Sequence, residues 1–330
     1  MTDTAFKLIT RYNNKILKSR IRSNWPDDFP VPPFDHQIDG AAAFLRSDGR
    51  MLLGWEMGSG KTIGAALILH IIKAGPTLMF APASLLLQHK AELQRVLPER
   101  EIEIFTGEEI HVKDFTKVIV LCSYHKTHKV RNWITGLPIK FEFVICDEST
   151  FIKNPKARRT KDVTAICKIT PFVLMLSGTP IINRPVDLFT QLRITNPDKF
   201  TDWWKFTRRY CKGHQGPFGY DATGLSNAGE LHSMISSIMH RVKKSDCLDL
   251  PSKMRKKLPV TVKLAAEYDT WHEEVEALGN AKAEAAVYWL LDWYAATADT
   301  NEKIVVFTRH VETAKYLSKQ VPHIAGVITG

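Results

Sequence analysis

The chain has 330 residues, long enough for two domains of ordinary size or for one large domain with an appendage. Hydrophobic residues make up 44% and charged residues 24%, a balance that is typical of a globular protein and excludes a largely disordered one. The net charge of +10 suits a polyanionic partner, nucleic acid before a membrane surface, although a need for solubility alone would also explain it.

Targeting signals and metal-binding patterns are not evident. No apolar stretch has the length of a membrane span, and residues 1–25 are basic without the apolar centre of a secretory signal. The five cysteines form no CxxC pair, which argues against a zinc site or a disulfide framework. We therefore expect an intracellular location, in the cytoplasm or nucleoid for a viral or bacterial protein and in the nucleus for a eukaryotic one.

From Met51 onward, short apolar runs alternate with helical patterns. Strands are expected at 51–55, 76–82, 101–105, 117–123, 141–148 and 172–180. Helices are expected at 60–73, 84–97, where Ser84 is a plausible N-cap, and 157–169. The alternation predicts an α/β fold with a doubly wound parallel sheet covered on both faces. Continuous apolar strands such as "VIVLC" fit burial on both faces.

The composition and the hydrophobic pattern of the sequence change after Thr179. Residues 185–250 are helical, aromatic and basic, and we expect a helical insertion there. "MRKKLPVTVKL" at 254–264 reads as a strand, and a long helix is expected from Ala265 to about Ala298. Residues 303–330 read as one strand–helix–strand unit, the start of a second α/β lobe.

"WEMGSGKT" directly follows the first expected strand and opens a helix. Gly58 and Gly60 let the backbone curl so that its N–H groups face phosphate oxygens at a helix N-terminus. Lys61 can reach the β and γ phosphates, and the hydroxyl of Thr62 can bind Mg²⁺. Trp55 stands where the strict pattern has glycine, so the match is to the shorter GxGKT form. A chance GKT in a loop is the alternative, but the flanking strand and helix favour nucleotide binding by Met57, Gly58, Ser59, Gly60, Lys61 and Thr62.

Two adjacent acids end the strand in "FEFVICDEST". Asp147 would hold Mg²⁺ directly or through water, because Mg²⁺ binds few carboxylates and keeps much of its hydration. Glu148 would orient or deprotonate the water that attacks the γ phosphate. A pair of surface acids is the alternative. Together with the upstream glycine loop, the acids favour hydrolysis of a bound nucleoside triphosphate, with Lys61, Asp147 and Glu148 as the catalytic set.

Seven ordered segments resemble the superfamily-two helicase-like ATPases: "FDHQIDGAAAFL", "WEMGSGKT", "APASLLLQHKAEL", "VICDEST", "LMLSGTPIINRPVDLFTQL", "RVKKSDCLDLPSK" and "KIVVFTRH". The chain most resembles the Swi/Snf-type double-stranded-DNA translocases, and residues 187–235 look like the annealing-helicase (HARP-like) branch. The resemblance covers nearly everything after about Pro32. It implies a RecA-like P-loop NTPase lobe, a helical insertion and the start of a second RecA-like lobe.

On this basis the chain divides into five parts. They are a basic N-terminal segment at 1–30, the ATP-binding lobe at 31–184, the helical insertion at 185–250, a strand and long helix linking the lobes at 251–302, and the beginning of the second lobe at 303–330.

The resemblance also implies roles for single residues. Gln37 would read the adenine, and Ser177 with Thr179 would link the nucleotide site to DNA movement. Six residues match DNA-contacting positions of the family: Pro82, Ser84, Gln88, Ser123, Tyr124 and Arg309. The chain departs from the family at Ser149–Thr150, where Ala–His or Ala–Asp is usual, and at Trp55, where Asp is frequent.

Several basic and aromatic clusters have two readings each. "KNPKARRTK", "RVKKSD" and "SKMRKK" could contact a DNA backbone or form solvated faces. The basic N-terminal set Lys7, Arg11, Lys15, Lys18 and Arg22 could lie on DNA, or its helix could pack on the first lobe. Trp203, Trp204, Phe206 and Tyr210 could stack on bases or form a buried helix face.

Taken together, the segments predict a DNA-dependent ATPase motor that uses ATP and Mg²⁺ and moves on duplex or branched DNA. A non-catalytic nucleotide- and DNA-binding module and an RNA helicase are the alternatives. A second lobe would need on the order of 100–150 residues, and its charge-stabilising arginines are not present in 303–330. We therefore expect a piece of a longer motor rather than a natural remnant with weak turnover, because a partial lobe would leave an aggregation-prone sheet edge.

Overall fold

The computed structural model covers residues 1–330 and divides into two compact units, Met1–Leu250 and Pro251–Gly330. It describes residues 14–23, 31–108, 110–137, 139–179, 184–217, 219–249, 254–259, 261–262, 269–300, 302–321 and 326–327.

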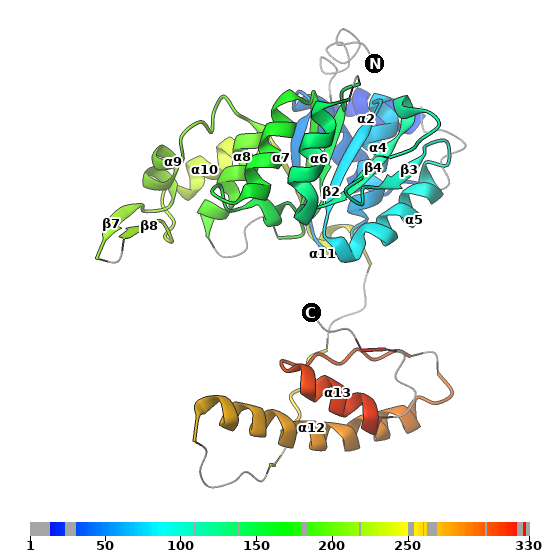
Figure 1. Ribbon diagram of the computed structural model, residues 1–330, viewed down its shortest axis with the longest axis vertical. Coiled ribbons are helices and arrows are strands. Elements are labelled where there is room, and N and C mark those ends of the chain that lie inside the picture. Colours follow the sequence, from blue (N-terminus) through cyan, green and yellow to red (C-terminus); the bar gives the residue numbers. More distant parts are fainter. Residues whose placement is uncertain are drawn as a thin grey trace. The chain divides into compact units, whose positions relative to one another are not determined.

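The first unit is built on a parallel sheet of seven strands in the order β3-β4-β2-β5-β6-β1-β9 (Figure 1). The strands are β1 Arg50–Trp55, β2 Thr77–Ala81, β3 Ile102–Ile104, β4 Ile119–Ser123, β5 Phe143–Cys146, β6 Phe172–Leu176 and β9 Met239–Val242. The expected doubly wound α/β fold is confirmed.

Helices cover both faces of this sheet, which explains the unbroken apolar strands. Along β1, Leu53 belongs to the apolar core beneath α3 Asp35–Arg46, α4 Lys61–Ile72 and α5 Leu86–Val96. Its neighbour Leu52 belongs to the opposite core, beneath α6 Thr127–Thr135, α7 Arg158–Ile169 and α8 Phe189–Thr195. The alternation is the period of two that a pleated strand imposes.

Short turns of 3-10 helix follow the carboxyl ends of β2, β4 and β5, and two others precede β4 and α8. They are η1 Ala83–Leu85, η2 Phe115–Lys117, η3 Tyr124–Lys126, η4 Ser149–Ile152 and η5 Pro185–Leu188. The expectation that Ser84 caps the following helix is wrong, because Ser84 lies inside η1 and its side chain makes no capping hydrogen bond.

The N-terminal helix α2 Asn14–Ser23 packs on α3. Leu17 and Ile21 are buried in the first core, while Lys18 pairs with Asp39 at 2.6 Å. This is the packing alternative of the two that the sequence leaves open. Lys7 and Arg11 lie outside the described residues.

Residues 185–250 differ in part from the expected helical insertion. Helices α9 Trp203–Tyr210, α10 Ala228–Ile235 and α11 Lys244–Cys247 and the hairpin β7 His214–Gly216 with β8 Gly219–Asp221 lie here. However, β9 returns to the main sheet and pairs with β1, Leu53 opposite His240. The strand "MHRV" contains His240 and Arg241, so it lacks the continuous apolar run that identifies the other strands.

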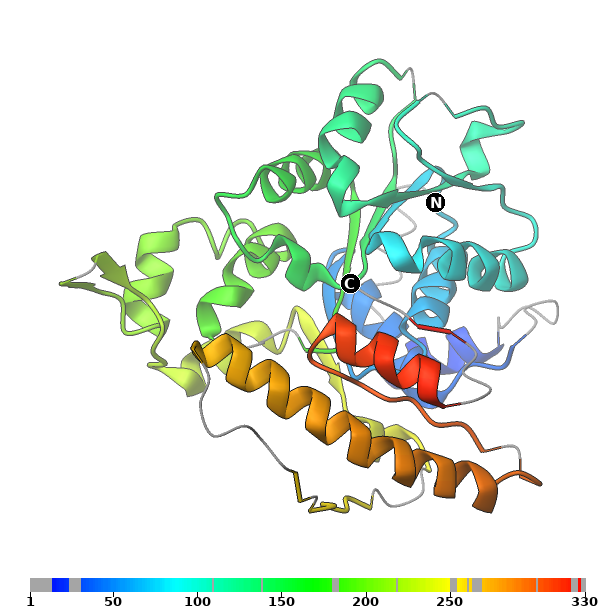
Figure 2. The same ribbon diagram turned by 60° about the horizontal axis from the view of Figure 1, so that its bottom comes forward.

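The second unit contains α12 Trp271–Ala296 and α13 Val311–Gln320, which lie side by side in both views (Figure 2). Ala283, Leu290, Leu317 and Val321 form their shared apolar core. The strands expected near 254–264 and at the start of 303–330 are not seen in the described stretches 254–259, 261–262 and 302–308. Phe307 is 92% exposed, and a lone strand has no neighbour to satisfy its backbone hydrogen bonds.

Among the described residues, no helix combines the length and the apolar character needed to cross a membrane.

Candidate nucleotide-binding site

The loop between β1 and α4 has the backbone that a phosphate site needs. Gly58 and Gly60 have φ values of 80° and 76°, in the left-handed region that glycine adopts without a steric penalty. At Gly60 an added Cβ would also lie 2.6 Å from the amide nitrogen of Gln37. The positive φ values therefore favour glycine at both positions, and α4 begins directly afterwards at Lys61.

Helix α3 holds this loop by two carbonyl groups. The ring nitrogen Nε2 of His36 lies 2.8 Å from the carbonyl oxygen of Ser59, and Nε2 of Gln37 donates to the carbonyl of Gly60 at 3.1 Å. The Oε1 atom of Gln37 accepts from the backbone N–H of Phe34 at 2.9 Å. Gln37 is buried and ties the loop to the start of α3, so adenine recognition by Gln37 stays a prediction.

Trp55 forms the base of the loop and explains one departure from the family pattern. The indole is fully buried and donates from Nε1 to Nδ1 of His240 at 2.9 Å. Added Cβ atoms at Gly40 and Gly64 would lie 2.3 Å and 2.6 Å from the Trp55 ring. The two glycines, on α3 and α4, therefore make the space that an aromatic residue needs at this position.

The loop and the acids meet at one histidine. His89, on α5, lies between them: its Nε2 is 2.9 Å from Oδ2 of Asp147, and its Nδ1 is 3.4 Å from Oγ1 of Thr62. Asp147 follows β5 directly and is only 5% exposed. The hydroxyl and carboxylate that the sequence predicts as Mg²⁺ ligands are therefore brought to opposite edges of one imidazole ring. Their donor types, a hydroxyl and one carboxylate, fit a Mg²⁺ that keeps most of its waters.

Glu148 is held in a strained conformation beside Asp147. Its φ and ψ are 45° and 54°, a left-handed backbone that a non-glycine residue adopts at an energetic cost. Burial raises the pKa of the Glu148 carboxyl, the negative charge of Asp147 raises the pKa further, and Lys61 opposes the shift. The glutamate therefore lies within the electrostatic reach of both halves of the site, with a basicity suited to accepting a proton.

The "SGT" turn after β6 lies against the phosphate loop. An added Cβ at Gly178 would be 3.1 Å from Cγ of Met57 and 3.6 Å from Nζ of Lys61. Ser177 is fully buried and its Oγ accepts from the N–H of Thr179 at 3.2 Å, while Thr179 is exposed. The two predicted coupling residues thus begin a turn that touches the nucleotide loop.

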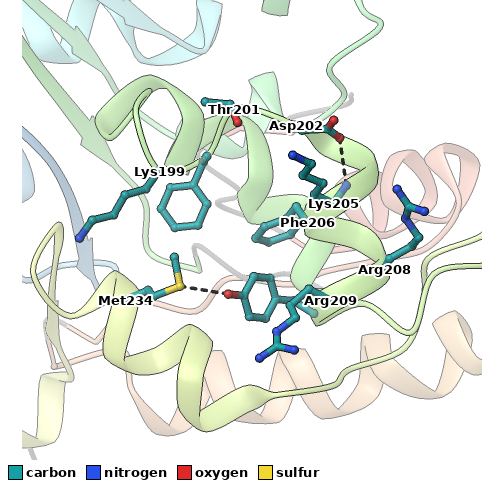
Figure 3. Close-up of a pocket in the computed structure, with 10 residues that line it drawn as sticks. Lys199, Thr201, Asp202, Lys205, Phe206, Arg208, Arg209 and Met234 are labelled. Atoms are coloured by element: carbon teal, nitrogen blue, oxygen red, sulfur yellow. Dashed lines mark hydrogen bonds between the residues drawn. The ribbon is translucent and has the colours of Figure 1, made fainter.

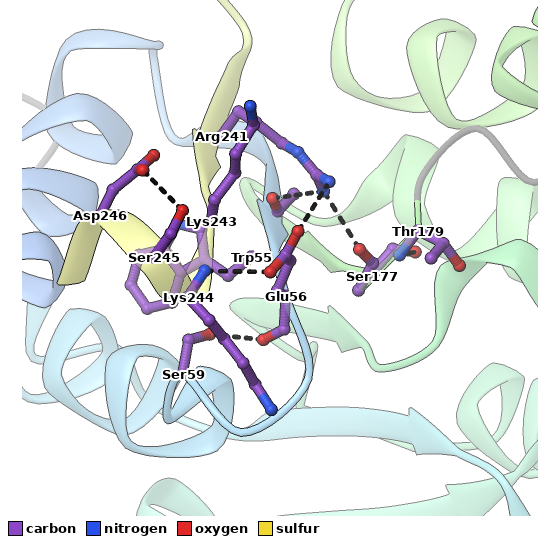
Figure 4. Close-up of polar contacts among 12 residues, drawn as sticks. Trp55, Glu56, Ser59, Ser177, Thr179, Arg241, Lys243, Lys244, Ser245 and Asp246 are labelled. Carbon is purple, nitrogen blue, oxygen red and sulfur yellow. Dashed lines mark hydrogen bonds and ion pairs between the residues drawn. The ribbon is translucent and has the colours of Figure 1, made fainter. Parts of the chain in front are cut away.

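Sequence reasoning missed the role of Arg241, which lies on β9. Its guanidinium donates to the carbonyls of Gly54 at 2.8 Å and Gly178 at 3.1 Å and faces Glu56 at 3.8 Å (Figure 4). The backbone N–H of Lys244 donates to the same Glu56 carboxylate at 3.0 Å. "RVKKSD" was expected to be a DNA contact or a solvated face; Arg241 instead ties the phosphate loop to the "SGT" turn.

The predicted DNA contacts on the first unit fall into two groups. Ser84 and Gln88 are exposed and Pro82 is half-buried, so this stretch is accessible; Gln88 donates to Glu92 at 2.9 Å. Ser123 and Tyr124 are buried, and their roles as DNA contacts stay predictions.

The packing around Tyr124 explains why its side chain is buried. Its ring, 1% exposed, stacks against Phe80 and Phe151 with centroids 6.0 Å and 5.2 Å away. Its hydroxyl donates to the backbone carbonyl of Asp147 at 2.7 Å, so Tyr124 supports the strand end that carries the acids. Arg309 is exposed on the second unit.

Two aromatic residues of α9, Phe206 and Tyr210, line a separate hollow. Phe206 and Tyr210 are buried, in agreement with the buried-face reading, whereas Trp204 is exposed. Figure 3 shows the hollow, with an apolar floor and a basic rim; the lining includes Lys199, Lys205, Phe206, Arg208, Arg209 and Met234.

The parallel sheet, the glycine loop at the carboxyl end of β1 and the acids at the end of β5 define a RecA-like nucleotide-binding lobe. Residues 36–312 match the SNF2-related domain, and the chain belongs to this family. The expected Swi/Snf-type relationship is confirmed.

Curated relatives and a solved structure agree with this. The chain is 31% identical over 290 residues to the mouse DNA annealing helicase and endonuclease ZRANB3, covering 83% of this chain and 27% of that protein. It is 31% identical over 313 residues to a Caenorhabditis elegans SWI/SNF-related regulator of chromatin subfamily A-like protein 1 homologue, covering 84% of this chain and 44% of that protein. The chain thus spans less than half the length of either relative.

The Sulfolobus solfataricus SWI2/SNF2 ATPase core in complex with dsDNA has the same fold, with a TM-score of 0.58 and 21% identity over 91% of this chain and 60% of that one.

Proposed function

We propose that the chain is the ATP-binding part of a DNA-dependent ATPase that moves on duplex or branched DNA. One observation carries the proposal: His89 lies within hydrogen-bonding distance of both Thr62, at the end of the glycine loop, and Asp147, one of the two acids. Membership of the SNF2-related family and relatives named as annealing helicases support the choice of DNA over RNA. The accessible stretch at Ser84 and Gln88 is the proposed DNA contact of this unit.

In the proposed reaction, Lys61 and the backbone N–H groups of the loop bind the triphosphate. Thr62 and Asp147 would hold Mg²⁺, which when bound would neutralise charge on the phosphate oxygens. Glu148 accepts a proton from the attacking water while the water oxygen bonds to the γ phosphorus and the bond to ADP breaks. The raised pKa of Glu148 favours this acceptance.

Coupling to DNA would use the turn at Ser177 and Thr179. Arg241 joins this turn to Gly54, near the end of the strand that leads into the phosphate loop, so a shift of the turn would be passed to the base of the loop through two hydrogen bonds. Because the proposed substrate is DNA, we place the protein wherever the DNA of its cell resides.

The test is phosphate release from ATP with and without duplex DNA, comparing the full-length protein with its Lys61→Ala and Glu148→Gln variants, because we expect only weak turnover from this chain alone. We expect DNA to stimulate release and either substitution to abolish the stimulation. Release that does not respond to DNA, or that survives both substitutions, would contradict the proposal. Replacing the duplex with single-stranded RNA distinguishes the RNA-helicase alternative.

A second candidate is a module that binds nucleotide and DNA without turnover. It is favoured by the second unit, whose described residues include two helices and no strand. It predicts Mg²⁺-dependent ATP binding with negligible release of phosphate even with DNA in excess.

A further inference from the structure

His89 has an unusual place in the site because both of its ring nitrogens face candidate magnesium ligands. Nε2 lies 2.9 Å from Oδ2 of Asp147 and Nδ1 lies 3.4 Å from Oγ1 of Thr62. The side chain is 4% exposed, so no bulk water competes for either nitrogen. The three residues come from α5, the end of β5 and the first turn of α4.

The chemistry of the partners fixes which nitrogen of a neutral imidazole carries the proton. A carboxylate can only accept a hydrogen bond, so Nε2 must donate to Asp147. In the neutral ring Nδ1 then carries the lone pair, and the hydroxyl of Thr62 must be the donor to it. For a neutral His89, the direction of the chain of hydrogen bonds is therefore Thr62 to His89 to Asp147.

This direction has a consequence for metal binding. With its proton directed at Nδ1, the Thr62 oxygen keeps its lone pairs available for a cation. With Oδ2 held by Nε2–H, the Asp147 carboxylate has a fixed orientation, and among the described residues no hydrogen bond occupies its other oxygen. Residues that hold the ligands of a metal in this way usually govern its affinity.

The geometry points to His89 as a positioning residue that orients both magnesium ligands, Thr62 and Asp147, of the nucleotide site. This inference rests on the proposed function, because it concerns the Mg²⁺ of the proposed ATP complex. Both ring nitrogens of His89 are engaged by Thr62 and Asp147, so neither is available to bind the metal directly in this arrangement.

The test measures equilibrium binding of a fluorescent, non-hydrolysable ATP analogue while Mg²⁺ is titrated against a chelator. His89→Leu removes both hydrogen bonds at similar volume, and His89→Gln restores a donor for Asp147. Arg95→Ala, an exposed change on the same helix, is the matched control. We expect His89→Leu to raise the Mg²⁺ concentration for half-maximal effect about 10–100-fold, without changing binding in chelator. His89→Gln should recover part of the loss, and Arg95→Ala should equal the parent.

A second measurement does not depend on the folding of a variant. Long-range ¹H–¹⁵N correlation spectra of the parent chain report the tautomer of each imidazole, with His89 assigned by its loss in His89→Gln. We expect the proton on Nε2. A proton on Nδ1, or a His89→Leu variant with the Mg²⁺ dependence of the parent or a stronger one, would overturn the inference. If the parent itself shows no Mg²⁺-dependent binding, the proposed function fails instead, which separates the two outcomes.

Discussion

Trp55 donates its indole N–H to Nδ1 of His240 at 2.9 Å, joining the strand that leads into the phosphate loop to the strand beside it. The pair ties the edge strand β9 to the base of the nucleotide site. Because the acceptor is a titratable nitrogen, this contact makes the stability of the first unit depend on pH.

We expect the first unit to lose stability as the pH falls below about 6.5, the usual pKa of an unfolded histidine. Burial lowers the pKa of His240 in the folded state, so its contribution is complete above the unfolded pKa and is lost as the unfolded chain gains a proton that the folded chain resists. Chemical unfolding between pH 5 and 8 measures this. His240→Asn keeps an acceptor that does not titrate, and its stability should fall less steeply than that of the parent; an identical slope would count against the assignment.

Gly64→Ala should destabilise the first unit by about 1–3 kcal/mol, although alanine favours helices. The added Cβ would lie 2.6 Å from the buried ring of Trp55. Gly229→Ala in α10 is the control, because its Cβ would meet no heavy atom within 4 Å and should leave stability unchanged or higher. The double variant Gly64→Ala with Trp55→Leu should lose less stability than the sum of the losses of the two single variants. Additive effects of the two substitutions would show that they do not share the space.

Glu148→Gln should reduce phosphate release by about 10²–10⁴-fold while nucleotide still binds, because the amide cannot accept the water proton. The raised pKa of Glu148 means that activity of the parent should decline as the pH falls and the carboxyl becomes protonated. This acidic limb of the pH–rate profile should be absent from the residual activity of the variant. Persistence of the limb would assign it to another group.

Glu148→Asn separates the strain at this position from its chemistry. Asparagine tolerates the left-handed backbone that Glu148 adopts at a φ of 45°, whereas glutamine does not. We expect both amide variants to be inactive, with Glu148→Asn more stable than Glu148→Gln by about 0.5–1 kcal/mol. Equal unfolding free energies would show that the backbone relaxes without the glutamate.

Arg241→Met should lower stability by about 1–3 kcal/mol and reduce the stimulation of phosphate release by DNA. It removes the two hydrogen bonds to the carbonyls of Gly54 and Gly178; the ion pair with Glu56 is exposed and adds little. Ser237→Ala, an exposed change shortly before the same strand and outside the basic clusters, is the control. If DNA stimulated phosphate release by Arg241→Met as fully as by the parent, Arg241 would not couple DNA binding to the nucleotide site.

Local sequence signals were sufficient for six strands of the main sheet, the glycine loop and the two acids. Each of these is encoded within a short window, by apolar runs, by Gly58 and Gly60, or by acids at a strand end. The strand β9 could not be predicted because His240 and Arg241 interrupt its apolar pattern. Their hydrogen-bond partners, Trp55 and Gly54, are far away in the sequence.

The contacts of His89 and Tyr124 could not be predicted from the spacing of residues along the sequence. His89 sits in an ordinary amphipathic helix, and only the fold brings it between Thr62 and Asp147. Tyr124 matched a DNA-contacting position, but the rings of Phe80 and Phe151 enclose it. A pattern identifies the segment, and the packing of the other segments decides what its side chains do.

The most direct test of the account is a structure of the chain with Mg²⁺ and a non-hydrolysable ATP analogue. We expect the triphosphate along residues 57–62, with Thr62 and Asp147 around one Mg²⁺ and Glu148 facing the γ phosphate. A triphosphate bound elsewhere, or an Mg²⁺ with neither Thr62 nor Asp147 in its first or second shell, would contradict the account.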